Sequence, residues 1–214
     1  MNLALDLDGT LISCEPRQTA VLRAALVGNG ANVNLNRIWE FKREGASTAV
    51  ALKKSGLSLE LAHRVANDWR RMIEEPFWLG MDTVLPGVLE MLNEVRKEGI
   101  HICLLTARSR REWVIQQLTR LGLLPWLDHI VVVSPQGAVK AKTLVLCELS
   151  AVAFFGDTES DWRASNAAGV PFYAVASGQR STTFLTSFDA GQVHLDLAAA
   201  WESFLTTSRH NHAA

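Results

Sequence analysis

Four places along the chain carry polar residues that could bind a phosphate group and a metal ion. Each place follows a short apolar segment: Asp6 and Asp8 the first, Thr106 the second, Lys140 and Lys142 the third, and Asp157 and Asp161 the fourth. Carboxylates that are brought together repel one another, and a hard cation with oxygen ligands, such as Mg²⁺, relieves that repulsion. These residue types therefore predict a site for a divalent cation and an anionic substrate.

The two N-terminal aspartates could share the chemistry of phosphoryl transfer. Asp6 could attack phosphorus in line and form an aspartyl-phosphate. Asp8 would point to the same side and could protonate the leaving oxygen and then deprotonate water. The alternative is purely structural, with Asp6 capping a turn and Asp8 forming an Asp-Gly turn with Gly9. The other three places along the chain favour the chemical interpretation.

The other core candidates also have structural alternatives. Thr106 and its neighbouring amides could hold phosphate oxygens, although a hydroxyl at a strand end often caps a helix instead. Lys142 begins an expected helix over 142–149, so its amine could reach back to a phosphate. Lys140 is the alternative, and the lysine that does not bind phosphate would be a solvated surface residue. Asp161 could complement a helix dipole as well as support a metal.

A polar segment over residues 41–47 adds Lys42 and Arg43, just before an expected helix. Either cation could pair with an anionic group of a substrate. A solvated run of charges is equally consistent with the sequence. Arg17 and Arg108 are weaker candidates, for which exposure to solvent is the default expectation.

Apolar segments and helical patterns alternate over the second part of the chain. Short apolar runs predict strands over residues 2–7, 100–105, 130–133, 151–155 and 172–175. Helical patterns lie between the later runs, and a capping box at Ser109 to Glu112 predicts the start of one helix. This alternation predicts an α/β fold, a parallel sheet with helices on both faces. Ligands bind at the carboxyl ends of such strands, where the four polar sets fall.

Residues 13–83 differ, because helical spacing dominates there. Patterns over 16–27, 47–54 and 58–75 predict an all-helical insertion after the first strand. The expected domains are therefore a catalytic core of residues 1–12 and 84–214 and a helical cap of residues 13–83.

Composition narrows the classes of protein. The 214 residues are 48% hydrophobic and carry a net charge of −1, which argues against a strongly basic nucleic-acid surface. No uncharged apolar stretch approaches about 18 residues, so a membrane span is not expected. The three cysteines fit reduced residues of a cytoplasmic protein better than a disulfide framework.

The chain resembles the haloacid dehalogenase superfamily. The strings DLDGTL, LLTAR and FFGDTESD, together with a lysine near a helix start, are similar to its four motifs and occur in the same order. The helical insertion and the sequence after the fourth motif resemble the phosphoglycolate-phosphatase-like branch. One departure is the absence of the common Lys-Pro pair of the third motif.

The resemblance implies roles for these residues. Asp6 would be the nucleophile and Asp8 the general acid and base. Mg²⁺ would be bound by Asp6, the backbone carbonyl of Asp8 and Asp157, with Asp161 as a direct or outer ligand. Thr106 and Lys142 would bind the phosphoryl group, and cap residues such as Lys42 and Arg43 would select the substrate.

We therefore expect a Mg²⁺-dependent phosphatase of a small soluble phosphate monoester. It would act as a monomer or homodimer, without nucleic-acid or membrane partners. A phosphoryl mutase of the same fold stays open, whereas Asp8 argues against a dehalogenase. A signalling receiver would carry its phosphorylated aspartate on a middle strand. A phosphate-sensing protein of the same fold would not need the intact pair of Asp6 and Asp8.

Overall fold

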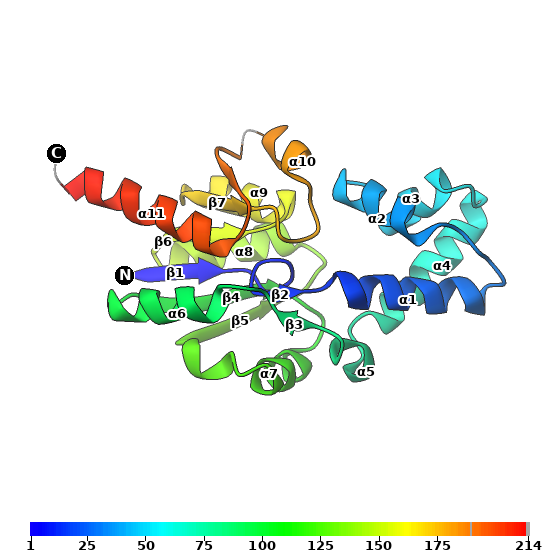
Figure 1. Ribbon diagram of the computed structural model, residues 1–214, viewed down its shortest axis with the longest axis horizontal. Helices are drawn as coiled ribbons and strands as arrows, with labels where there is room; N and C mark the ends of the chain where they lie inside the picture. The colour runs from blue at the N-terminus through cyan, green and yellow to red at the C-terminus, as the bar shows by residue number, and fades with distance from the viewer. Residues whose placement is uncertain (189, 213–214) are drawn as a thin grey trace.

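A six-stranded parallel sheet lies at the centre of the computed structural model, which describes residues 1–188 and 190–212 (Figure 1). The strand order is β5-β4-β1-β6-β7-β8. The strands are β1 (Asn2–Leu5), β4 (His101–Ala107), β5 (His129–Val133), β6 (Ala151–Gly156), β7 (Phe172–Val175) and β8 (Val193–His194). Because β1 pairs with both β4 and β6, the carboxyl ends of these three strands meet at one edge.

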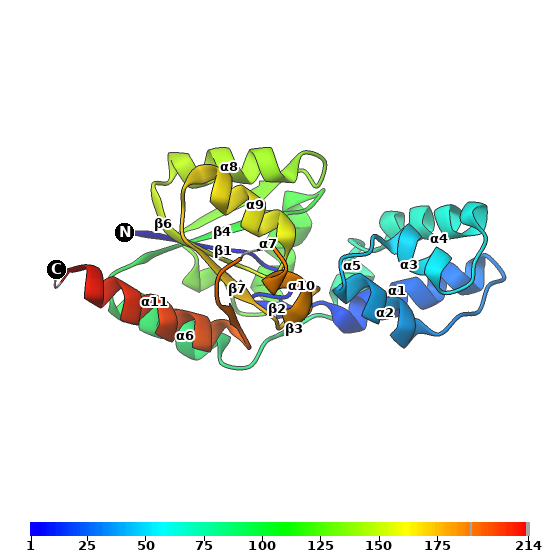
Figure 2. The same ribbon diagram turned by 90° about the horizontal axis from the view of Figure 1, so that it is seen from above.

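Helices cover both faces of this sheet. Helices α8 (Ala138–Glu148) and α9 (Glu159–Ala168) lie on one face, and α6 (Val88–Lys97) and α11 (Leu197–His212) lie on the other (Figure 2). Helix α7 (Arg111–Arg120) packs into the same core as α6. The remaining short helical segments of the core are the 3₁₀ turn Leu124–Trp126 and α10 (Thr182–Thr186).

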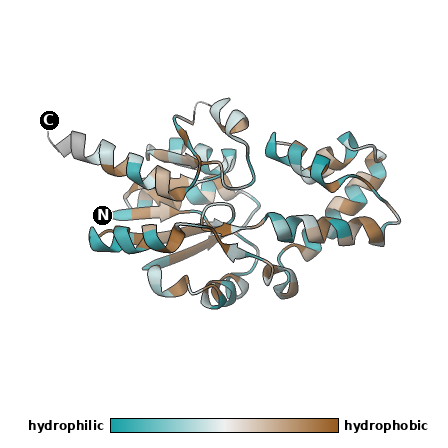
Figure 3. Ribbon diagram, viewed as in Figure 1, coloured by the Kyte–Doolittle hydropathy of each residue, from teal (hydrophilic) through white to brown (hydrophobic). Residues whose placement is uncertain are grey.

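Alternation along β1 explains how the chain supports two cores. Leu3 and Leu5 pack toward α6 and α11, whereas Ala4 faces α8 and α9, and all three are fully buried. A parallel sheet that is covered on both faces requires apolar residues at successive positions. Figure 3 shows the corresponding pattern, with apolar colour along the strands and mixed colour around the helices.

Four helices form a separate layer beyond the carboxyl ends of the strands (Figure 1). They are α1 (Glu15–Gly28), α2 (Leu35–Arg43), α3 (Thr48–Lys54) and α4 (Leu59–Met72), and they bury their own apolar cluster. The short helix α5 (Pro76–Leu79) leads back toward the sheet. The antiparallel pair β2 (Ile12–Ser13) and β3 (Thr83–Val84) joins this cap to the core, near the two domain boundaries that the sequence predicts.

The expected α/β class is confirmed, while several local expectations are wrong. Helix α8 begins at Ala138, so Lys142 lies one turn inside the helix and does not open it. The capping box is absent, because the hydroxyl of Ser109 donates to Glu74 and Arg110 is the N-cap residue of α7 without a side-chain bond. Lys42 and Arg43 lie in the last turn of α2, which the sequence did not predict. Within residues 1–188 and 190–212, none of the helices is both long and apolar enough to cross a bilayer.

Helix α6 offers a test of the packing against the sheet. Leu92 is fully buried in the larger core, whereas Leu89 on the same helix is 41% exposed. We expect Leu92→Ala to lower the free energy of unfolding by about 2–5 kcal/mol, because it leaves a cavity. Leu89→Ala should change it by less than about 1 kcal/mol. Chemical denaturation of both variants measures the difference, and equal losses would contradict the described orientation of α6.

Candidate active site

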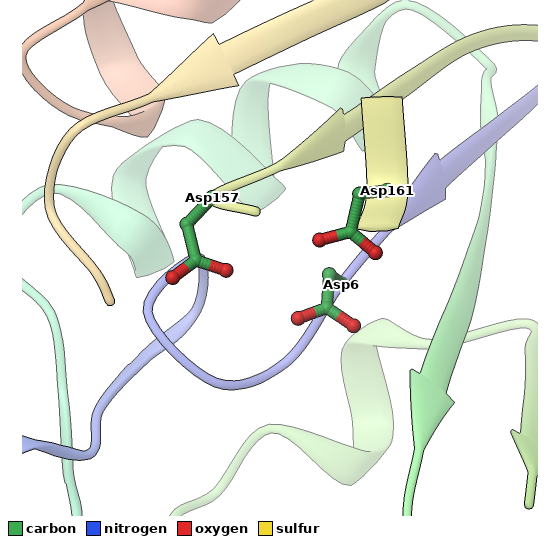
Figure 4. Close-up of side chains that lie close together, drawn as sticks. All are labelled: Asp6, Asp157 and Asp161. Carbon is green, nitrogen blue, oxygen red and sulfur yellow. The ribbon is translucent and has the colours of Figure 1, made fainter. Parts of the chain in front are cut away.

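Three buried carboxylates meet at the carboxyl edge of the sheet. Asp6 follows β1, Asp157 follows β6, and Asp161 lies in the first turn of α9. Each offers an oxygen, and these oxygens lie within 4.8 Å of one another, as Figure 4 shows. Asp6 is 6% exposed and the other two are 1% exposed or less. The strand order therefore gathers carboxylates that are about 150 residues apart in the chain.

Lys142 supplies positive charge to this cluster. Its Nζ lies 2.7 Å from Oδ1 of Asp6 and 2.6 Å from Oδ1 of Asp161, and it donates to both. Burial opposes the charged amine, but the two carboxylates outweigh burial and raise the pKa of Lys142. The alternative residue, Lys140, is exposed, and no hydrogen bond or ion pair joins it to these carboxylates within the described residues. The structure thus brings Lys142, and not Lys140, to the carboxylates.

A single ammonium group does not neutralise three buried carboxylates. Burial raises the pKa of Asp6 to about 7, and the nearby Asp161 and Asp8 add to this effect while Lys142 opposes it. Burial, followed by the charges of Asp6 and Asp161, raises the pKa of Asp157 well above its usual value. The cluster therefore lacks positive charge.

Asp157 has one carboxylate oxygen without a partner. Its Oδ2 accepts a hydrogen bond from the backbone N–H of Gln179 at 2.5 Å, whereas its buried Oδ1 has no hydrogen-bond partner among the described residues. An orphaned carboxylate oxygen beside two further carboxylates is the kind of donor set that a hard divalent cation prefers. The residues present therefore fit a divalent metal ion.

Two glycines leave room for the carboxylate of Asp157. A Cβ at Gly178 would lie 2.0 Å from Oδ2 of Asp157, and a Cβ at Gly9 would lie 2.3 Å from the same atom. Gly9 also has a φ of +79°, which places it in the left-handed region. The loop after β1 and the loop after β7 can therefore approach the Asp157 carboxylate only because both carry glycine.

Asp8 is held by two arginines, which corrects the expectation that Arg17 and Arg108 are exposed. Arg108 donates through Nε to Oδ2 and through Nη2 to Oδ1, both at 2.7 Å, and Nη2 of Arg17 donates to Oδ1. Both arginines are buried. Burial alone would raise the pKa of Asp8, but Arg108 and Arg17 outweigh burial and hold that pKa below its usual value.

Arg17 also joins the cap to the core. It comes from cap helix α1, and its Nε donates to Asp82 at 3.0 Å while its Nη1 donates to the carbonyl of Ile73 at 2.8 Å. Asp82 accepts a further bond from Gln117 of α7. The sequence offers no signal for this role of Arg17. The position of Arg108, two residues after Thr106 at a strand end, is a signal that could have been given more weight.

The two cap cations do not reach the carboxylate cluster. Lys42 is buried in the cap, where its Nζ donates to Gln18 and lies 4.3 Å from the ring centre of Trp69. Burial lowers the pKa of Lys42 to about 7. The Nη1 and Nη2 atoms of Arg43 donate to the carbonyls of Gly178 and Ala176, at 2.8 and 3.3 Å. Arg43 thus ties the end of α2 to the loop after β7.

A cleft of about 710 Å³ lies between the cap and the core. Asp8, Arg108 and Gln179 line it from the core, and Gln18, Trp69 and Arg70 line it from the cap. Thr106 is buried near the end of β4 beside this cleft, and its hydroxyl has no hydrogen-bond partner among the described residues. The cleft gives a small molecule access to the polar edge of the sheet.

Comparisons with known proteins identify the family of this chain. Residues 2–169 match the family model of haloacid dehalogenase-like hydrolases. A phosphoglycolate phosphatase from Pseudomonas syringae pv. tomato is 30% identical over 200 residues, which cover 82% of this chain and 69% of that protein. A phosphoglycolate phosphatase from Pseudomonas putida is 25% identical, over 81% of this chain and 68% of that protein.

A solved structure shows the same fold. It is a haloacid dehalogenase-like hydrolase from Streptococcus pneumoniae, with a TM-score of 0.77 and 15% identity, covering 95% of this chain and 97% of that one. The chain belongs to the haloacid dehalogenase-like hydrolases, in the phosphoglycolate-phosphatase-like branch, and is a phosphatase enzyme. The resemblance noted in the sequence is confirmed.

The close approach at Gly178 gives a test of the site geometry. Gly178→Ala should displace the Asp157 carboxylate, because the added Cβ would lie 2.0 Å from its Oδ2. A displacement of about 1 Å can cost on the order of 100-fold in rate, so we expect a loss of that size in kcat/KM for p-nitrophenyl phosphate. Gly28→Ala, with no atom within 4 Å of its added Cβ, is the matched control. Full activity of a folded Gly178→Ala variant would contradict the described site.

Proposed function

We propose that this protein is a Mg²⁺-dependent phosphatase that hydrolyses a small phosphate monoester through an aspartyl-phosphate on Asp6. The observation that carries the proposal is the buried group of Asp6, Asp157 and Asp161, with Lys142 bridging two of them and one oxygen of Asp157 unpartnered. Such a group combines a nucleophile, cation ligands and a fixed positive charge within a few ångströms.

Asp6 would attack the phosphorus atom, and the alcohol of the ester would leave. The bond from Lys142 to Asp6 orients the nucleophile and keeps a positive charge near the phosphoryl oxygens. The unpartnered hydroxyl of Thr106, at the end of the neighbouring strand β4, would donate to one of those oxygens. Water would then hydrolyse the phosphoaspartate and release inorganic phosphate.

Asp8 would donate a proton to the leaving oxygen in the first step, and its carboxylate would take a proton from the attacking water in the second. It stands two residues after the nucleophile and faces the cleft. Its two arginines fix the direction of the carboxylate and favour its ionised form, which is the form that accepts a proton from water.

Asp6, Asp157 and the backbone carbonyl of Asp8 would hold the Mg²⁺ ion, with Asp161 as a direct or outer ligand. When bound, the ion supplies positive charge that lets the anionic ester approach and that stabilises the charge on the transferred group. In its absence, Lys142 is the one basic side chain among the described residues that pairs with these carboxylates, and anionic substrates would be repelled.

The cap would select the substrate. Lys42 would act through Gln18 and Trp69, which line the cleft, and Arg43 would hold the end of α2 against the core. The names of the two Pseudomonas relatives make phosphoglycolate the first substrate to test. The free thiols of Cys14, Cys103 and Cys147 fit the reducing cytoplasm, where the enzyme would act as a monomer or homodimer.

Replacing the nucleophile tests the central claim. Asp6→Asn should reduce turnover of phosphoglycolate and p-nitrophenyl phosphate by more than about 100-fold, because an amide cannot form the aspartyl-phosphate. The matched control is Asp128→Asn, which lies next to the opposite end of the sheet, before β5. Inorganic phosphate release measures both, and melting temperatures check the fold. Turnover above a hundredth of the wild-type rate would contradict the role of Asp6.

The metal is tested by titration. Activity should disappear with EDTA and return with Mg²⁺. Asp157→Ala should weaken activation by Mg²⁺ far more than Glu159→Ala, because both oxygens of Glu159 accept from Arg180 and it is not part of the carboxylate group. If both variants respond alike to added Mg²⁺, the assignment of Asp157 is wrong.

Net release of phosphate from a metabolite panel separates the phosphatase from a mutase, which would retain phosphate on a sugar.

A further inference from the structure

Five lysine and arginine side chains are buried among the described residues. For four of them, either the hydrogen bonds that they make or their position away from the cleft argues against a role in binding substrate. The five are Arg17, Lys42, Arg108, Lys142 and Arg180. Arg17 uses all three of its nitrogens, on Asp8, Asp82 and the carbonyl of Ile73. Lys142 bridges two carboxylates. Neither Lys42 nor Arg180 lines the cleft between cap and core.

Arg108 differs from the other four. It lines the cleft and is only 5% exposed, yet only its Nε and Nη2 atoms have partners, both on Asp8. No described residue accepts a hydrogen bond from its Nη1. Arg108 lines the cleft, and the two N–H groups of its Nη1 contact no acceptor of the described chain, so they are available to a ligand in the cleft.

The position of Arg108 indicates which part of a substrate would meet this nitrogen. In the proposed function, Asp8 exchanges a proton with the leaving oxygen and would therefore face it. Arg108 donates through Nε and Nη2 to the two oxygens of that same carboxylate. Thr106, two residues earlier, belongs to the phosphoryl side. In the proposed function, the free edge of Arg108 would therefore lie beyond the phosphoryl group, next to the portion of the substrate that leaves.

Other described groups around the cleft accept no hydrogen bond from this edge, although Glu74 adds to the effect of Asp8 in raising the pKa of Arg108. Glu74 is the other carboxylate that lines the cleft, and its two oxygens accept from the backbone N–H and the hydroxyl of Ser109. Arg17 and Arg70 also line the cleft, so basic groups outnumber acidic ones there. The leaving group therefore enters a region in which an anion is favoured.

We propose that Arg108 is a specificity-determining residue that binds a carboxylate carried by the leaving alcohol. The planar guanidinium matches a carboxylate in geometry, and a lysine at this place would not offer the same pair of parallel donors. The inference rests on the proposed phosphatase activity and adds which residue recognises the leaving group. This residue belongs to the core and directly follows the strand that holds Thr106, so it would select the substrate in addition to the cap residues.

Two substrates of equal length isolate the carboxylate. Phosphoglycolate and 2-hydroxyethyl phosphate differ in the end group of the leaving alcohol, and the ratio of their kcat/KM values measures selectivity for the charge. Arg108→Met should lower this ratio by roughly 10- to 100-fold relative to wild type, the range for one charge-assisted hydrogen bond. Arg108→Lys should restore part of it, because a charge returns without the planar geometry.

The ratio separates recognition from positioning. Arg108 also orients Asp8, so both substrates should lose kcat in Arg108→Met, but that loss is common to both and cancels in the ratio. Arg110→Met is the matched control, since Arg110 is exposed and pairs with Glu112 outside the cleft. It should leave the ratio unchanged. A second readout is inhibition of p-nitrophenyl phosphate hydrolysis by glycolate, which should weaken in Arg108→Met and not in Arg110→Met.

The results with these variants support or contradict the role of Arg108 in binding the carboxylate. An unchanged ratio in a folded Arg108→Met variant would overturn the inference and leave Arg108 as a positioning residue for Asp8. A wild-type enzyme that hydrolyses both esters without preferring the carboxylate would overturn it too, while the proposed phosphatase function would survive. If Arg108→Met does not fold, the Arg108→Lys ratio and its glycolate inhibition decide in its place. A wild-type enzyme that releases phosphate from no ester would refute both proposals together.

Discussion

Repulsion among three buried carboxylates is the constraint on which the rest of this structure depends. Asp6, Asp157 and Asp161 lie at one edge of the sheet, Lys142 donates to two of them, and burial raises the pKa of Asp6 and of Asp157. At low dielectric, like charges at such distances are strongly unfavourable. The cluster is short of positive charge, and the proposed binding of a cation and the proposed catalysis both depend on this deficit.

The scaffold meets this constraint with rigid elements. The carboxylates stand at the ends of β1 and β6 and in the first turn of α9, and the sheet beneath them is covered on both faces. Gly9 and Gly178 let two loops close around Asp157, where any side chain would collide with its carboxylate. Side chains that repel one another can thus be held in a fixed geometry, because the cost is offset by packing elsewhere in the core.

The cap and the core are coupled through the same site. Arg17 comes from α1 of the cap and binds Asp8 of the core, while Arg43 at the end of α2 holds the loop that carries Gly178. Glu74, beyond α4, accepts two bonds from Ser109. A movement of the cap would therefore alter the partners of Asp8 as well as the access to the cleft. The position of the cap and the placement of the Asp8 carboxylate are linked by these contacts.

The sequence alone determined the α/β class, the helical cap and the four groups of polar residues, because these depend on local periodicity and on where strands end. It indicated Asp6, Asp157 and Asp161 as neighbours, since parallel strands align their carboxyl ends. Only the tertiary structure decided between Lys142 and Lys140, because the choice depends on where α8 begins and which side of it faces the sheet. Likewise, the sequence predicts that Arg17 and Arg108 are exposed, whereas in the folded chain both bind Asp8, which lies 9 and 100 residues away in the sequence. Whether a charged side chain can be buried depends on partners that are distant in the chain. The local sequence pattern around the charged residue does not reveal those partners.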